Sequence, residues 1–208
     1  MAIYPSPAVI NLLYLDKLRS LSDSERIPMG RPHRFRLPNP ASAPPTTRDT
    51  IIDFTFPHPT YVELPTVHPA VYHNPYRFAY GITTLDPPSH QTFADALIKL
   101  DMSASSFTPS SSSTETDSPP LVDGEPALNP HKIWHLAGHT PSEPIFVPRP
   151  GGTAEDDGVI LSVVLDEEHK RSALVVLDAM EMREIARAEM KDVFPIGFHG
   201  VWSGGEVP

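Results

Sequence analysis

The chain has 208 residues, a formal net charge of −10 and no cysteine. Without Cys, disulfides and thiolate metal sites are excluded, so any metal would be held by His and carboxylate groups, a donor set that suits non-haem iron as well as zinc or manganese. The acidic balance argues against nucleic acid as a partner, because affinity for a phosphate backbone depends on Lys and Arg.

The 26 prolines argue against a helical bundle, because proline breaks helices and central strands. Residues 8–18 fit either a short helix or a buried strand, since periodicity does not separate the two at this length. β-Branched and aromatic composition predicts strands at 34–38, 50–56 and 77–85. Residues 93–102 fit either a strand pair or one helical turn.

A Ser/Thr/Pro tract occupies residues 103–120 and is predicted to be disordered, because it is too polar to bury a core. It separates two ordered pieces of the chain. No run of 18 apolar residues is present, so no transmembrane helix is expected. The apolar start of the chain is interrupted by Pro5 and Pro7 and lacks a basic segment, which makes it a poor signal peptide.

The second ordered piece carries the stronger strand signals. Residues 180–190 fit either a short helix or a turn followed by a strand. Strands at short spacing, joined by turns, predict an all-β propeller, sandwich or barrel. The predicted strands cover 132–136, 143–150, 158–166 and 172–179, with a hairpin turn at 167–171.

Residues 142–158 read SEPIFVPRPGGTAEDDG. This segment closely resembles the C-terminal signature of the carotenoid oxygenase family, in which SEP-[IV]-FV-x-[RH]-P is followed by an acidic E-D-D-G turn and an apolar strand. The blocks VILSVVLD, LVVLDA, IARAEM and PIGFHGVW then follow in the family's order up to residue 202. Residues 63–82, ELPTVHPAVYHNPYRFAYGI, resemble the family's E-[FL]-P segment more loosely. The family also includes the retinal pigment epithelium isomerohydrolase and stilbene-cleaving dioxygenases.

The resemblance implies an all-β fold made of the C-terminal blades of a seven-bladed β-propeller, incomplete in this chain. Residues 1–208 would then be one partial domain with the disordered insertion at 103–120. The family holds one Fe(II) on the propeller axis with four His, three of which are hydrogen-bonded by Glu. By their place in the motifs, His199 is the expected iron ligand, and Glu143 and Glu63 are the expected carboxylates. A carboxylate in that role fixes the ring and raises its basicity.

The implied function is that of a non-haem Fe(II) dioxygenase that cleaves a conjugated C=C bond of a carotenoid or apocarotenoid with O₂ to give carbonyl products. The implied partners are O₂ and an apolar polyene, whether carotenoid, apocarotenoid or stilbenoid. A cytoplasmic location is expected, with peripheral membrane contact left open because such substrates dissolve in lipid.

The alternative is a catalytically inactive fragment that lacks three of the four iron-binding His. None of the other nine His lies in a matching context, and the missing ligands are expected upstream of Met1. An incomplete propeller also leaves an open sheet edge, so missing N-terminal blades or a partner chain would be needed for closure.

Two other groups of residues suggest metal sites less strongly. His131, His135 and His139 have an H-x3-H-x3-H spacing, but the segment is predicted to be a strand, on which such residues lie too far apart to chelate. The acidic run 155–157 lacks the EF-hand pattern and is predicted to be a solvated turn before a strand.

Overall fold

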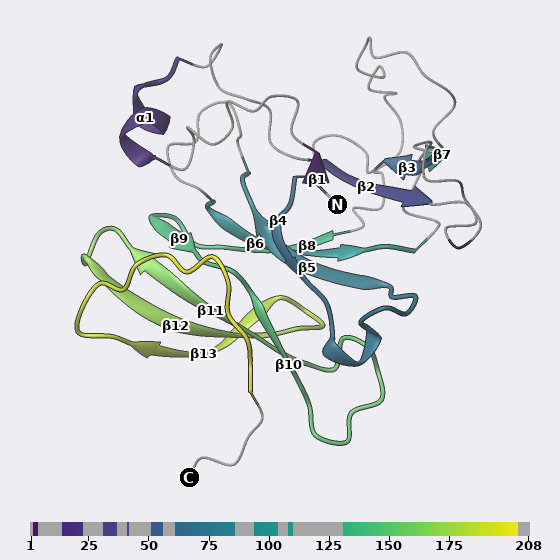
Figure 1. Cartoon of the computed structure of the whole chain (residues 1–208). Coiled ribbons are helices and arrows are strands. Elements are labelled where there is room, and N and C mark those ends of the chain that lie inside the picture. The colour runs from purple at the N-terminus through teal and green to yellow at the C-terminus, as the bar shows by residue number, and fades with distance from the viewer. Residues whose placement is uncertain are drawn as a thin grey trace, which may run out of the picture.

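The computed structural model describes residues 2–3, 14–22, 31–36, 41, 51–55, 61–85, 94–103, 108–109 and 131–203. These residues form three antiparallel sheets and a short helix, α1 (Leu15–Ser20) (Figure 1). Within residues 8–18, the helical alternative is therefore the one adopted from Leu15 onward. Among the residues described, no helix is long and apolar enough to span a bilayer.

The N-terminal sheet has the order β1-β2-β3-β7. β2 and β3 confirm the strands predicted near 34–38 and 50–56. Residues 108–109 of the Ser/Thr/Pro tract form a short strand, whereas 104–107 and 110–120 lie outside the described residues, where the predicted disorder remains a prediction. The strands are β1 (Ala2–Ile3), β2 (Arg31–Arg36), β3 (Ile51–Thr55) and β7 (Thr108–Pro109).

The middle sheet has the order β4-β5-β6-β8. Residues 96–101 make one strand, so neither a strand pair nor a helical turn at 93–102 is correct; pairing with both β5 and β8 fixes the extended form. A 3₁₀ turn at Pro69–Val71 follows the first strand. The strands are β4 (Glu63–Thr66), β5 (Phe78–Thr83), β6 (Ala96–Asp101) and β8 (His131–His135).

The C-terminal sheet has the order β10-β11-β12-β13, and β9 also pairs with β11. It confirms the predicted hairpin and shows that 180–190 is a turn followed by a strand. The strands are β9 (His139–Pro141), β10 (Ile145–Pro148), β11 (Gly158–Asp166), β12 (Arg171–Asp178) and β13 (Arg183–Glu189).

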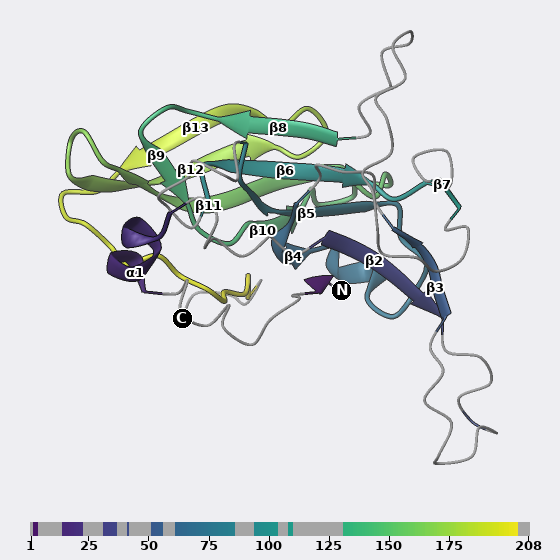
Figure 2. The same ribbon diagram turned by 90° about the horizontal axis from the view of Figure 1, so that it is seen from above.

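The middle sheet lies between the other two (Figures 1 and 2). Its β5 and β6 are buried on both faces, as in a strand sandwiched by neighbouring layers. One face carries a cluster of Val62, Ala79, Ile98 and Leu100. The opposite face builds the main core with the C-terminal sheet, from Tyr80, Ile82, Ala94, Leu97, Trp134, Phe146, Ile160, Val164, Val175, Leu177, Ala179 and Met182.

The strands of the middle sheet and those of the C-terminal sheet follow the chain order in the same direction, from one side of the core to the other. Figure 2 shows β4 beside β10 at one edge and β8 beside β13 at the other. The ring of Phe146 in β10 lies 5.5 Å from that of Tyr80, and Trp134 of β8 hydrogen-bonds to Glu184 of β13. The first strands of both sheets therefore lie on the same side of the molecule.

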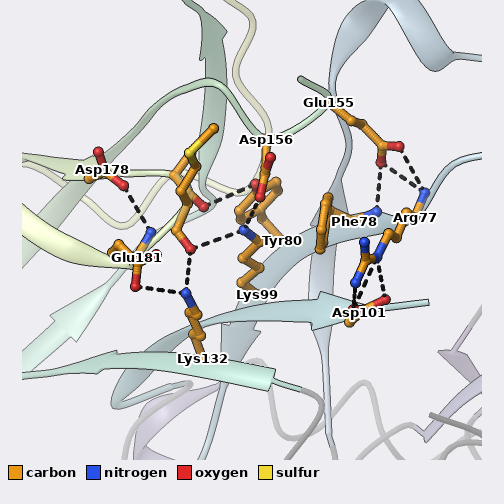
Figure 3. A network of polar contacts seen from close by, with 12 residues as sticks. Arg77, Phe78, Tyr80, Lys99, Asp101, Lys132, Glu155, Asp156, Asp178 and Glu181 are labelled. Carbon is orange, nitrogen blue, oxygen red and sulfur yellow. Dashed lines mark hydrogen bonds and ion pairs between the residues drawn. The ribbon is translucent and has the colours of Figure 1, made fainter. Parts of the chain in front are cut away.

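The acidic turn between β10 and β11 joins these two sheets (Figure 3). The Glu155 carboxylate accepts hydrogen bonds of 2.6–3.0 Å from the backbone N–H groups of Arg77 and Phe78. Asp156 Oδ2 lies 2.7 Å from Lys99 Nζ, whose side chain is only 6% exposed. The predicted turn before β11 is confirmed, but it is not merely solvated, because Glu155 and Asp156 hold it to the start of β5 and to β6.

Candidate metal centre

His199 lies in the C-terminal segment that follows β13, beside the start of β10. Its Nδ1 is 3.5 Å from Glu143 Oε1. The imidazole is 84% exposed, whereas the Glu143 side chain is only 15% exposed. The structure thus brings together two of the three residues expected at the site, and it orients Nδ1 of the ring toward the carboxylate. Among the described residues, Nε2 of His199 has no hydrogen-bond partner.

The second oxygen of Glu143 binds the backbone next to the histidine. Gly200 N–H donates to Glu143 Oε2 at 2.5 Å. A Cβ on residue 200 would lie 2.8 Å from Ile145 Cδ1, so a glycine lets the segment approach β10 this closely. One carboxylate therefore holds both the ring of His199 and the main chain that carries it.

Glu143 is directed toward His199 by a bulge between β9 and β10. Pro141 pairs with Val164 and Ile145 pairs with Leu161, so three residues, 142–144, face two on β11. Such a bulge shifts the alternation of the strand and re-aims a side chain. Pro144 is fully buried, and Ser142 N–H donates to Val163 O at 2.9 Å. The backbone on either side of Glu143 is therefore fixed.

Glu63, the third expected residue, begins β4 and also precedes a bulge. The register shifts between Glu63 and Thr66, and Leu64 in between has a φ of 48°. A Cβ on Gly81 would overlap Val62 Cγ2 and the Glu63 carbonyl oxygen, so only glycine lets β5 pass this close. Both sheets thus use a bulge in the first strand at the position of the carboxylate.

One oxygen of the half-buried Glu63 carboxyl group lacks compensation for its burial. Oε1 is buried and has no hydrogen-bond partner among the residues that the structure describes. Burial raises its pKa from 4.5 to about 7, because a charged carboxylate is poorly stabilised away from water. Glu63 pairs in register with Ile82, so it shares the side of the sheet that faces the C-terminal sheet. A buried acceptor of this kind fits a role as partner to an imidazole N–H.

The other histidines whose side chains the structure describes do not gather into a metal site. His131 and His135 both lie in β8, as predicted, and His135 Nδ1 contacts Asp95 O at 2.9 Å. His139 lies in β9, with Nδ1 3.0 Å from Ala137 O. Across the described part of the chain, no group of three or more His, Asp or Glu side chains is placed to hold a metal ion. The described residues therefore fit a set of one ligand histidine, His199, and two carboxylates, Glu143 and Glu63, that would hydrogen-bond to ligand histidines.

Sequence reasoning did not single out Ser162 or Gly200. Ser162 is 2% exposed and donates its hydroxyl hydrogen to Ser142 O at 2.9 Å, next to Glu143. A serine in the middle of the apolar run GVILSVVLD was the available signal, because a buried hydroxyl needs a partner. Nothing local marks the Gly200 contact.

Comparisons with known proteins place these motifs in context. The family model described as retinal pigment epithelial membrane protein matches residues 1–204. The chain is 35% identical over 199 residues to carotenoid cleavage dioxygenase 8 homolog A, chloroplastic, of Oryza sativa subsp. japonica, covering 96% of this chain and 31% of the relative. It is 35% identical over 172 residues to torulene dioxygenase of Fusarium fujikuroi, covering 81% and 25%.

Solved structures agree with the sequence comparisons. A cobalt-substituted ACO (apocarotenoid oxygenase) of Synechocystis is similar with a TM-score of 0.62 and 28% identity, over 88% of this chain and 32% of that chain. An ACO/RPE65 chimera gives a TM-score of 0.62 with 26% identity, over 88% of this chain and 32% of that chain. The chain spans between a quarter and a third of the length of the proteins named here.

Proposed function

This chain belongs to the carotenoid oxygenase family, and we propose that it forms the C-terminal part of a non-haem Fe(II) dioxygenase that cleaves a conjugated C=C bond of a carotenoid or apocarotenoid with O₂. The relatives named carotenoid cleavage dioxygenase and torulene dioxygenase support the reaction class. The observation that carries the proposal is the pairing of His199 Nδ1 with Glu143, which leaves Nε2 of the exposed ring without a protein partner among the described residues.

The residues present fit an iron site in part. His199 would supply one ligand through Nε2, because Glu143 accepts at Nδ1 and so fixes the ring tautomer and orientation. Glu63 would accept from the Nδ1–H of a second ligand histidine, which would relieve its unpaired burial. The chemistry that bound Fe(II) supplies is activation of O₂ toward the polyene. The role of this chain is to hold one imidazole and to present two carboxylates to ligand rings.

The fold that we propose for the longer protein is a seven-bladed β-propeller, of which the middle and C-terminal sheets are two blades. The middle sheet has its four strands in chain order, as do β10 to β13 of the five-stranded C-terminal sheet, and β4 and β10 lie on the same side (Figure 2). The outer face of the C-terminal sheet is apolar and only half-buried, which supports a further blade or partner chain packing there. Its residues include Val159, Leu161, Val163, Leu165, Leu174 and Val176.

The described residues argue against iron binding by this chain alone. They provide no three-ligand group, and the chain spans between a quarter and a third of the length of the relatives named above. We therefore propose that the remaining ligands come from propeller blades in the rest of the ring, and that the 208 residues alone are catalytically inactive. The substrate partner would be an apolar polyene; a cytoplasmic location with peripheral membrane contact stays a prediction.

Metal analysis with far-UV circular dichroism tests this division. The 208-residue chain should give a β-type spectrum and far less than one iron per molecule. A longer protein that supplies the preceding blades should hold about one iron and convert an apocarotenoid into carbonyl products. His199→Ala in that protein should lose the iron while keeping the spectrum. Retention of stoichiometric iron and cleavage by His199→Ala would rule out the proposed ligand.

A further inference from the structure

The bulge between β9 and β10 leaves a backbone carbonyl without its ladder partner. Three residues on one strand face two on β11, and Pro144 has no N–H to donate. The Ser142 carbonyl lies inside this bulge, on a residue that is only 5% exposed. A buried carbonyl in such a position needs a donor from elsewhere, since nearly all buried backbone groups are paired.

Ser162 provides that donor from the middle of β11. Its hydroxyl lies 2.9 Å from Ser142 O, and its side chain points into the core beside Ile160 and Val164, on the face shared with Val175. The same stretch of β11 accepts the Ser142 N–H through Val163 O. Both backbone groups of Ser142 are therefore tied to β11, directly before Glu143.

We propose that Ser162 is a positioning residue for Glu143: its hydroxyl completes the bulge and thereby holds the carboxylate on Gly200 N–H and beside the His199 ring. The final step, from a held carboxylate to a held metal ligand, rests on the proposed function. The first step does not, because it concerns only the contacts of Glu143 within this chain.

Hydrogen exchange of the Gly200 amide, followed by NMR on the 208-residue chain, reports directly on the Glu143 contact. Ser162→Ala should speed this exchange by about tenfold, because the bulge loses its donor and the carboxylate its fixed position. Ser162→Thr keeps the hydroxyl and should restore slow exchange. If Ser162→Ala does not fold, Ser162→Cys, with its weak S–H donor, should give an intermediate rate.

Ile160→Val is the matched control, since it trims the same face of the same strand two positions away without touching the bulge. It should lower the melting temperature to a similar extent but leave the Gly200 exchange unchanged. Equal exchange rates in Ser162→Ala and wild type, or equal acceleration in Ile160→Val, would overturn the positioning role.

The iron content of the longer protein separates this inference from the proposed function. Ser162→Ala should weaken iron retention there, and Ser162→Thr should restore it. Suppose that the Gly200 exchange rate depends on Ser162 but the longer protein never binds iron. That result would reject the proposed function and support the positioning of Glu143 by Ser162. If Ser162→Ala changes neither the iron retention nor the Gly200 exchange rate, the positioning role of Ser162 is rejected and the proposed function is unaffected.

Discussion

The backbone N–H of Gly200 donates a 2.5 Å hydrogen bond to the carboxylate of Glu143, 57 positions earlier in the chain. The contact fastens the C-terminal segment to the first strand of the last sheet. Since Oε1 of the same carboxylate faces His199 Nδ1, the main chain and the ring are fixed by one side chain. The position of His199 therefore depends on Glu143 in two ways, which substitution can separate.

Glu143→Gln should separate charge from geometry. The amide oxygen can still accept from Gly200 N–H, but the neutral side chain no longer places a negative charge beside the His199 ring. We expect Gly200 exchange to stay slow while metal affinity of the longer protein falls about 10–100-fold. Glu143→Ala should lose both, as NMR exchange and metal analysis would show. Equal metal affinity in all three proteins would contradict the role of the carboxylate.

Glu63 should make stability depend on pH. Burial holds its pKa at about 7 in the folded chain, whereas the unfolded chain releases the proton near 4.5. Between these values the folded state binds more protons, so the free energy of unfolding falls as pH rises. Glu63→Gln removes this loss and should be more stable than wild type above pH 7, on the order of 2–3 kcal/mol. Urea unfolding across the pH range measures the difference.

Asp101→Asn is the control with the opposite sign. A side-chain hydrogen bond from Arg77 lowers the pKa of Asp101. The contribution of Asp101 to the free energy of unfolding is therefore present at neutral pH and is lost as pH falls through the folded pKa.

The difference in stability between Glu63→Gln and wild type should vanish in a longer protein that supplies an imidazole partner. A wild-type profile that parallels Glu63→Gln from pH 4 to 8 would show that Glu63 is not buried without a partner.

The Lys99–Asp156 pair should be one of the strongest polar contributions to stability at the interface of the two sheets (Figure 3). The two side chains are 6% and 17% exposed. Asp156→Asn leaves the ammonium group buried without its counter-charge, so we expect a loss of about 3 kcal/mol in urea unfolding. Asp157→Asn, which releases only the exposed Arg149, should cost at most about 1 kcal/mol.

A double variant tests whether the stability lost in Asp156→Asn comes from leaving the buried Lys99 without its counter-charge. Lys99→Met with Asp156→Asn removes both charges and leaves the Met180 carbonyl with its second donor, Lys132 Nζ, at 3.0 Å. The double variant should be more stable than Asp156→Asn alone. Additive losses from the two substitutions would instead mean that the residues act independently.

Ser172 fastens the other end of the segment that leads to His199. Its hydroxyl accepts from Phe194 N–H at 2.9 Å, and its backbone N–H donates to Asp192 O at 3.3 Å. Ser172→Ala should cost about 1 kcal/mol and expose the segment to cleavage by chymotrypsin after Phe198, since Pro195 protects the bond after Phe194. Ser20→Ala, which removes a hydroxyl bond on α1, should leave the cleavage rate unchanged.

Much of the fold could be predicted from the sequence because short runs of apolar and β-branched residues between turns indicate strands. The run at 158–166 alternates between core and outer face and forms β11 over those residues. The segment at 93–102 was harder, since a short apolar run carries no clear period; its pairing with β5 and β8 made it one strand.

The all-β class and the places of His199, Glu143 and Glu63 in recognisable motifs follow from the sequence alone. The burial and the hydrogen bonds of these residues depend on how the sheets pack. A bulge directs Glu143 and Ser162 completes that bulge, whereas a second bulge follows Glu63. The packing of the sheets buries Glu63 Oε1 without a partner among the described residues. Local patterns report neighbours along one strand, whereas pairing register, burial and hydrogen bonds between residues 20 to 81 positions apart exist only after the sheets have packed.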